Sequence, residues 1–289
     1  MVCDLMAEGR IVSIFDKAVN ILMPQGLLVS LVERRNQMTA MSVRCPAVFE
    51  SLSSRRLRLR VGDTAYVKPD RLTIEGLRID LVTARRFQGM VDPDMAFRFD
   101  SAKISVFDRV LSTLGRRDGL LELIGGRLSG NSFAQKGLAI RNRILGLPRS
   151  LMAETLAEFV GLGVGFTPSG DDLICGFLLG QKICSMSACR LKPHHRESLF
   201  SMLDEAEREI IWGSADRTSD GGRTLIWMAL HDRFPRFLLD AAAGLARAEG
   251  TAAMARVVGA AVSRGHTSGT DALVGLLLYL QMFGQISRQ

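Results

Sequence analysis

The sequence has few of the residues that mark the common kinds of functional site. Its 289 residues include five cysteines, an odd number without a Cys-x-x-Cys pair, which favours buried thiols in a reducing cytoplasm. Only two tryptophans and two tyrosines are available to stack on bases, so the formal net charge of +7 does not by itself indicate a nucleic-acid partner. Small anionic metabolites fit this charge at least as well.

Long hydrophobic runs are also missing. The longest apolar stretch, near residues 272–283, is interrupted by Gly275 and Gln281 and falls short of the roughly 20 residues that a spanning helix needs. The first ten residues contain no basic segment followed by an apolar run, so we expect no signal peptide. With 47% hydrophobic and 23% charged residues, the composition predicts a folded cytoplasmic protein with no membrane partner.

Several familiar catalytic motifs are absent. The sequence contains no Gly-x-x-x-x-Gly-Lys-Ser/Thr, no Gly-x-Gly-x-x-Gly, no Gly-x-Ser-x-Gly and no His-Glu-x-x-His. Each motif would supply a phosphate loop, a dinucleotide turn, a nucleophile elbow or a zinc-binding helix. The chain therefore gives little basis for a nucleotide kinase, a dinucleotide-binding enzyme, a serine hydrolase of the elbow type or a zinc protease.

One polar stretch is hard to explain as ordinary core. The first motif, residues 161–176, reads Gly-Leu-Gly-Val-Gly-Phe-Thr-Pro-Ser-Gly-Asp-Asp-Leu-Ile-Cys-Gly. Alternating glycines allow positive φ angles and close backbone approach, and the Thr-Pro-Ser-Gly-Asp-Asp segment has the residues of a helix start. Several backbone N–H groups point out of such a helix end, which makes it a potential site for a small anion.

The same pattern recurs about a hundred residues later. The second motif, residues 265–275, reads Gly-His-Thr-Ser-Gly-Thr-Asp-Ala-Leu-Val-Gly and matches the first once Pro168 is looped out. The spacing from serine to aspartate and from aspartate to glycine is the same in both copies. We therefore predict two similar helix N-termini that face one site.

The chain divides into a strand-rich and a helix-rich part. Short apolar runs between turn residues predict strands at 11–14, 18–22, 26–33, 38–43, 57–61, 65–67, 72–74 and 77–82. Helical spacing predicts helices at 104–114, 134–146, 149–161, 169–188, 196–213, 222–232, 235–248, 251–264 and 269–283. The predicted class is α+β, with a β-rich antiparallel sheet or small barrel in residues 1–115 and a larger α-helical domain in residues 116–289.

The candidate site residues come mainly from the two motifs. We assign catalytic roles to His266, Asp172 and Asp271, with His266 as general acid and base. The predicted substrate-binding residues are Gly163, Gly165, Thr167, Ser169, Gly170, Asp171, Thr267, Ser268, Gly269, Arg127 and Asn131. Backbone N–H groups of the glycines would hold ligand oxygens, and Arg127 or Asn131 would contact substrate from the loop 125–131, which otherwise serves as a linker.

The carboxylates admit more than one interpretation. Aspartates in the first turn of a helix can simply oppose the helix dipole, and a lone histidine is often a structural hydrogen-bonding group. Asp172 and Asp271 would otherwise accept hydrogen bonds from the amide nitrogens of a ligand, or hold a divalent cation such as Mg²⁺. No metal-binding side-chain cluster is predicted, and no other cofactor is implied.

The two motifs together resemble the AllH-like family, whose namesake is a subunit of oxamate carbamoyltransferase in anaerobic allantoin breakdown. Val164 and Phe166 are mild departures outside the polar positions. The resemblance implies carbamoyl chemistry on oxalurate, oxamate or a related small acid, with other subunits or further copies of the chain as partners. The alternatives are a non-catalytic metabolite-binding or partner subunit, and a divergent member with another small acid as substrate.

Overall fold

The computed structural model describes residues 6–54, 56–94, 97, 99–125, 132–146, 151–188 and 203–286. The chain forms two compact units, one of residues 1–89 with 235–237 and one of residues 90–234 with 238–289. The predicted division into domains 1–115 and 116–289 stays a prediction. Residues Arg127 and Asn131 lie outside the described part of the chain.

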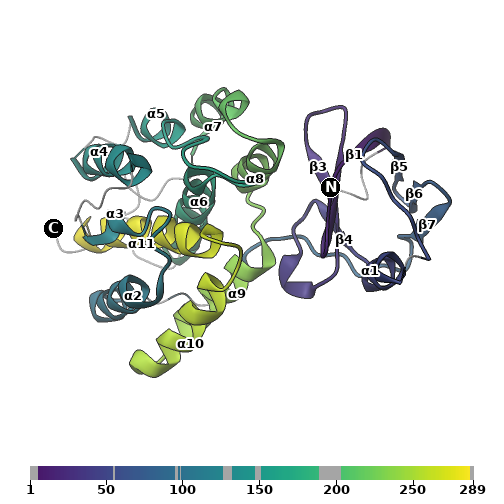
Figure 1. The fold of residues 1–289 in the computed structure, drawn as a ribbon. Helices are drawn as coiled ribbons and strands as arrows, with labels where there is room; N and C mark the ends of the chain where they lie inside the picture. The colour runs from purple at the N-terminus through teal and green to yellow at the C-terminus, as the bar shows by residue number, and fades with distance from the viewer. Residues whose placement is uncertain are drawn as a thin grey trace. The chain divides into compact units, whose positions relative to one another are not determined.

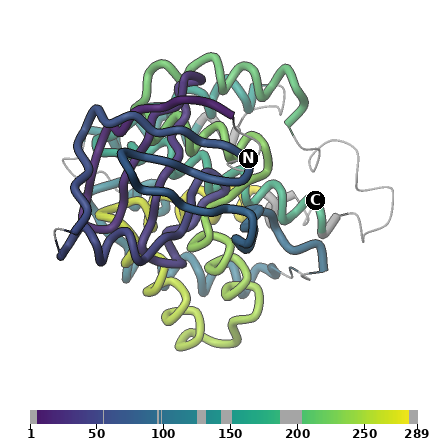
Figure 2. The backbone as a smooth tube through the Cα atoms, turned by 90° about the vertical axis from the view of Figure 1, so that its right-hand side faces the viewer, coloured from purple at the N-terminus to yellow at the C-terminus, as the bar shows by residue number. Residues whose placement is uncertain are grey.

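The first unit is built on a curled sheet (Figure 1). Its strands are β1 (Ala7–Phe15), β2 (Ala18–Leu22), β3 (Leu28–Val32), β4 (Ser42–Arg44), β5 (Thr64–Lys68), β6 (Arg71–Ile74) and β7 (Leu77–Asp80). They run side by side in the order β4-β3-β2-β1-β5-β6-β7. The purple and blue tube in Figure 2 traces this part of the chain. Every described pairing is antiparallel except that of β3 with β4, which is parallel.

Alternating side chains give the sheet one covered face. Val19 and Ile21 of β2 are fully buried, and so are Val67 of β5 and Leu72 and Ile74 of β6. Because successive residues of a strand point to opposite faces, these residues bury one face of the sheet. Asn20, between Val19 and Ile21, is buried as well, so β2 is covered on both faces. The alternation that predicted strands therefore also decides which face packs, and the predicted β-rich N-terminal sheet is confirmed.

The strand predicted at residues 57–61 is wrong. This segment is irregular, and it follows helix α1 (Pro46–Ser53), which sequence periodicity did not indicate. Pro46 occupies the first helical turn, and Val48 and Phe49 are buried. The backbone N–H of Leu57 donates to the carbonyl of Ser51 at 3.1 Å, so the chain turns back on the end of α1 instead of pairing with a strand.

The second unit is helical, as predicted. Its helices are α2 (Ser101–Leu114), α3 (Glu122–Gly125), α4 (Ser132–Gly146), α5 (Met152–Ala157), α6 (Ser169–Ala188), α7 (Glu205–Trp212), α8 (Asp220–Leu230), α9 (Arg236–Arg247), α10 (Gly250–Val262) and α11 (Ser268–Ile286), with a short 3₁₀ turn η5 (Ala215–Arg217). The first two residues of α9 are counted with the first unit. Among the described residues, no helix is long and apolar enough to cross a membrane. The predicted α+β class is therefore confirmed.

Helices α6 and α11 pack closely against one another in the second unit (Figure 1). A Cβ atom added to Gly176 would lie 1.8 Å from the carbonyl oxygen of Ala272, and one added to Gly275 would lie 1.9 Å from that of Leu173. The two helices therefore cross where each motif ends in glycine, because only a residue without a side chain allows the two backbones to come so close. This crossing holds the two helix N-termini in a fixed relation.

Candidate functional site

The two motifs meet at the N-termini of α6 and α11. The Thr167 hydroxyl of the first motif lies 3.2 Å from the Ser268 hydroxyl of the second. The Ser169 hydroxyl of the first lies 3.5 Å from the Thr267 hydroxyl of the second, at the outer limit of a hydrogen bond. The contacts are reciprocal, since threonine of each copy meets serine of the other. The predicted juxtaposition of the two motifs is confirmed.

A pair of buried carboxyl groups lies beneath these hydroxyls. Asp172 accepts a hydrogen bond from Thr167 at 3.0 Å, and Asp271 accepts one from the backbone N–H of Leu120 at 2.7 Å. Both side chains are almost completely shielded from solvent. Burial raises the pKa of Asp172 well above its usual range, and the charge of Asp271 raises it further, while Ser268 and Thr167 oppose the shift.

Asp271 has a buried oxygen without a partner. Burial raises its pKa to about 6, against the lowering effects of Leu120, Ser169 and Thr267. The two hydroxyls lie near enough to favour the ionised form, yet neither meets the geometry of a hydrogen bond to Oδ2, which remains unsatisfied. An unsatisfied buried acceptor costs about 1–3 kcal/mol. The centre of the site therefore holds an acceptor that a donating group would stabilise.

Asp171 has a different surrounding from Asp172. Its Oδ1 accepts from the N–H of Gly161 at 2.8 Å, and its Oδ2 accepts from the hydroxyl of Thr218. Burial raises its pKa to about 6, and these two hydrogen bonds oppose the rise. Both oxygens therefore accept hydrogen bonds within the chain. These bonds connect the glycine loop at Gly161, and the segment before α8 at Thr218, to the start of α6. Direct contact of Asp171 with substrate stays a prediction.

The motif glycines divide into two groups. The N–H of Gly170 donates to Leu162 at 2.7 Å and that of Gly269 donates to Arg264 at 3.0 Å, so neither is available to a ligand. This corrects the expected donation from these two groups, which instead allow close backbone packing. Gly163 and Gly165 have φ angles of 113° and 110°, and no described residue accepts a hydrogen bond from their N–H groups.

His266 lies at the outer edge of the site. Its ring is 79% exposed and its Nε2 is 3.0 Å from the carboxylate of Asp118, which is also exposed. It is therefore in solvent, unlike the buried Asp172 and Asp271. Its predicted role as general acid and base stays a prediction. Within the described residues, no group of three or more histidine, cysteine, aspartate or glutamate side chains is arranged to hold a metal ion.

The sequence analysis missed Arg264, which immediately precedes the second motif. Its side chain is half-buried, burial lowers its pKa, and the nearby charge of Asp172 opposes that lowering. The guanidinium thus lies within electrostatic reach of Asp172. It is not among the groups that set the pKa of that carboxyl, which burial and the charge of Asp271 raise. The signal available in the sequence was a basic residue directly adjoining the repeat. The sequence analysis also did not assign Thr218 to the site, although its hydroxyl donates to Asp171.

The chain thus combines a curled sheet with a helical unit in which two Gly/Thr/Ser/Asp motifs meet. The family described as oxamate carbamoyltransferase subunit AllH matches residues 159–280, which include both motifs. The AllH family N-terminal domain matches residues 2–86. This chain therefore belongs to the AllH family and is related to carbamoyltransferase subunits. No curated protein and no solved structure matches it.

The buried aspartates predict a pH-dependent stability. Asp171 and Asp271 have pKa values raised to about 6 in the folded chain, above the value of about 4 in an unfolded chain. Their stabilising contribution is full below pH 4 and is lost as the pH rises through 6, because ionisation inside the protein is disfavoured. The free energy of unfolding should fall by up to about 3 kcal/mol per group across this range.

Urea unfolding measured between pH 4 and pH 7.5 checks this expectation. Asp271→Asn removes one titrating group and should flatten the dependence, whereas Asp220→Asn removes an exposed carboxylate and should leave it unchanged. A dependence of equal steepness in wild type and Asp271→Asn would show that Asp271 does not titrate in this range.

Proposed function

We propose that this chain is a carbamoyltransferase-type subunit that binds a small ureido or amide acid between the two motifs. The substrates of this proposal are oxalurate or oxamate with phosphate or carbamoyl phosphate, in allantoin breakdown. The supporting observation is the reciprocal set of four hydroxyls above the buried Asp172 and Asp271. Because a hydroxyl of this set donates to a buried carboxyl, the site favours a ligand group that donates hydrogen bonds.

The hydroxyls of Thr167, Ser169, Thr267 and Ser268 form a hydroxyl layer that is suited to an amide nitrogen. Thr167 donates its only proton to Asp172, so Ser268 is the donor in its 3.2 Å contact with Thr167, and one lone pair of the Thr167 oxygen is left for a donor from outside. The unsatisfied Oδ2 of Asp271 is a further acceptor in the same place. A carbamoyl or oxamate –NH₂ group has two donors and satisfies both needs. A ligand group with only acceptor oxygens would be repelled by the Thr167 oxygen and by Oδ2 of Asp271, which are acceptors too.

The edge of the site supplies hydrogen-bond donors and a positive charge instead of acceptors. Arg264 carries a fixed positive charge near Asp172, and the N–H groups of Gly163 and Gly165 are unused by the described residues. A guanidinium offers a planar fork of donors for a carboxylate or phosphate. We assign the acid group of the substrate to Arg264 and the glycine N–H groups, and its amide end to the hydroxyl layer.

The transfer itself requires one bond to break and one to form. The carbamoyl carbon leaves the oxamate nitrogen and joins an oxygen of phosphate, and the nitrogen takes up a proton. His266 is the proposed proton carrier, held by the Asp118 carboxylate at 3.0 Å from Nε2.

A non-catalytic role in a larger enzyme is the second candidate. The family description names a subunit, and the proposed proton carrier is exposed at the edge of the site instead of lying beside the buried carboxyls. In that case the motifs would hold the ligand while another chain, or another copy of this one, completes the reaction. Transfer activity measured for the chain alone and with its partner subunits separates these two candidates.

Calorimetric titration with oxamate, oxalurate, carbamoyl phosphate and phosphate, with and without Mg²⁺, tests the proposed ligand class. We expect an amide-bearing acid to bind wild type, and Asp172→Asn to weaken that binding about tenfold or more. An asparagine –NH₂ donates where the carboxyl accepted, which turns a hydroxyl proton toward the ligand amide. The control Asp220→Asn should bind as wild type does. Equal binding by Asp172→Asn, or no binding of any amide acid, would contradict the proposal.

A further inference from the structure

A cavity lies between α7 and α8, and no residue of the two motifs lines it. Its volume is about 390 Å³, within the range of small-molecule sites, and it is lined by Glu205, Arg208, Glu209, Trp212, Trp227, Leu230 and His231. It lies at the C-terminal end of α8, whereas Thr218 ties the other end of that helix to Asp171. We call it the tryptophan pocket, because both tryptophans of the sequence line it.

The aromatic wall of the tryptophan pocket is fixed in place. The Trp227 and His231 rings lie 4.4 Å apart between centroids and are inclined by 33°. The Nδ1 of His231 lies 2.7 Å from the carbonyl oxygen of Trp227, which only accepts, so that nitrogen carries the proton. Trp212 ends α7 at the other side of the cavity. The indole rings of Trp212 and Trp227 thus border one cavity. An indole face is apolar and forms no conventional hydrogen bond, so it can contact the apolar part of a ligand.

The carboxylates of the pocket are unpaired within the described residues. Glu205 and Glu209 are four positions apart on α7, so they share one face of the helix. Both side chains are exposed, and neither forms an ion pair or a hydrogen bond with another described residue. Carboxylates beside indole faces favour a positively charged ligand, since each attracts a cation and the indole adds a cation–π contribution.

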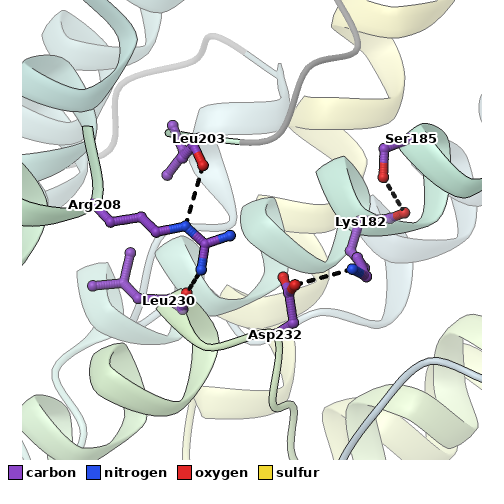
Figure 3. Close-up of polar contacts among 6 residues, drawn as sticks. All are labelled: Lys182, Ser185, Leu203, Arg208, Leu230 and Asp232. Atoms are coloured by element: carbon purple, nitrogen blue, oxygen red, sulfur yellow. Dashed lines mark hydrogen bonds and ion pairs between the residues drawn. The ribbon is translucent and has the colours of Figure 1, made fainter. Parts of the chain in front are cut away.

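The one arginine of the lining is committed to the backbone. The Nε of Arg208 donates to the carbonyl of Leu203 at 3.1 Å, and a terminal nitrogen donates to the carbonyl of Leu230 (Figure 3). The neighbouring Asp232 is paired with Lys182 at 2.9 Å, as the same view shows. Arg208 therefore joins the end of α8 to the start of α7, with two of its donor groups engaged, which disfavours an anionic ligand here.

We propose that the tryptophan pocket binds a small organic cation with an aromatic or apolar body, held between the indoles and the carboxylates of Glu205 and Glu209. This is a site separate from the two motifs, and it is opposite to them in the charge of its ligand. The proposal is independent of the carbamoyl-transfer function, because it rests only on the cavity and its lining.

Intrinsic fluorescence gives a direct test, since the only two tryptophans both line the cavity. Benzyltrimethylammonium is the probe, and benzyl alcohol and benzoate are the neutral and anionic comparisons. We expect a saturable fluorescence change with the cation alone, confirmed by calorimetry. The Glu205→Gln/Glu209→Gln variant should bind the cation at least tenfold more weakly, because both attracting charges are removed.

The control Glu154→Gln/Glu249→Gln removes the same charge from exposed positions outside the lining and should bind as wild type does. Circular dichroism establishes that each variant is folded. Equal binding of benzoate or benzyl alcohol would overturn the preference for a cation. Unchanged affinity in folded Glu205→Gln/Glu209→Gln, or no saturable response of wild type to the cation, would overturn the site.

Discussion

Gly176→Ala is expected to lower the free energy of unfolding by about 3 kcal/mol or more, the upper part of the range for overpacking a core. The added methyl would lie 1.8 Å from the carbonyl oxygen of Ala272. That oxygen belongs to the backbone of α11 and cannot rotate away, so the two helices must separate. Gly275→Ala should have a similar effect, because its methyl would lie 1.9 Å from the carbonyl of Leu173. Urea unfolding followed by circular dichroism measures both.

Alanine substitutions at two other helix glycines provide a series with smaller expected losses of stability. Gly180→Ala places a methyl 2.8 Å from the Cβ of Tyr279, a less severe overlap than 1.8 Å, so we expect a smaller loss. Gly259→Ala in α10 meets nothing within 4 Å and should stabilise the protein by up to about 1 kcal/mol through helix propensity. If Gly176→Ala does not fold, the order of Gly180→Ala and Gly259→Ala still decides the matter. Equal effects at 180 and 259 would contradict the close crossing of α6 and α11.

Arg264→Met is expected to weaken binding of an amide-bearing acid by about 10- to 100-fold. This follows from the loss of a charge-assisted hydrogen bond to the acid group, worth about 1.5–3 kcal/mol. Methionine keeps much of the apolar stem, so the change removes charge more than packing. Arg264→Lys should recover part of the affinity, because it restores the charge without the planar fork. Calorimetric titration at fixed ionic strength measures all three proteins.

The matched control is Arg256→Met, which removes an exposed arginine from α10. It changes the net charge by the same amount, so it separates a local effect from the general attraction of a basic protein for anions. We expect wild-type affinity for this variant. If Arg264→Met and Arg256→Met weaken binding equally, Arg264 does not contact the ligand and its role is limited to balancing the charge of Asp172.

Several features of the site were predictable because they depend on residues close in sequence. The alternating glycines of the first motif predicted positive φ angles, and Gly161, Gly163 and Gly165 all have them. The shared order of threonine, serine, glycine and aspartate predicted two equivalent helix starts, and α6 and α11 begin at Ser169 and Ser268. Local conformational preference and side-chain order decide both features, so the sequence was sufficient.

Local reasoning failed where distant groups compete for the same atoms. Gly170 and Gly269 looked like donors to a ligand, but Leu162 and Arg264 accept from their N–H groups. The sequence assigned both Asp171 and Asp172 to the substrate site, yet Asp171 accepts from Gly161 and Thr218 within the chain, whereas Asp172 accepts from Thr167 of the hydroxyl layer. Which acceptor a donor finds depends on chain segments that the spacing of a motif does not reveal.

The sequence by itself determined the α+β class, the order of most strands and helices and the positions of the two motifs, because periodicity and turn residues act over a few positions. Tertiary structure alone decided that Thr167 meets Ser268, that the Asp271 oxygen is left without a partner, and that Arg264 lies near Asp172. It also brought Trp212 and Trp227 around one cavity. These arrangements follow from packing between distant segments, in particular from the crossing of α6 and α11 at Gly176 and Gly275, where two backbones approach too closely for a side chain.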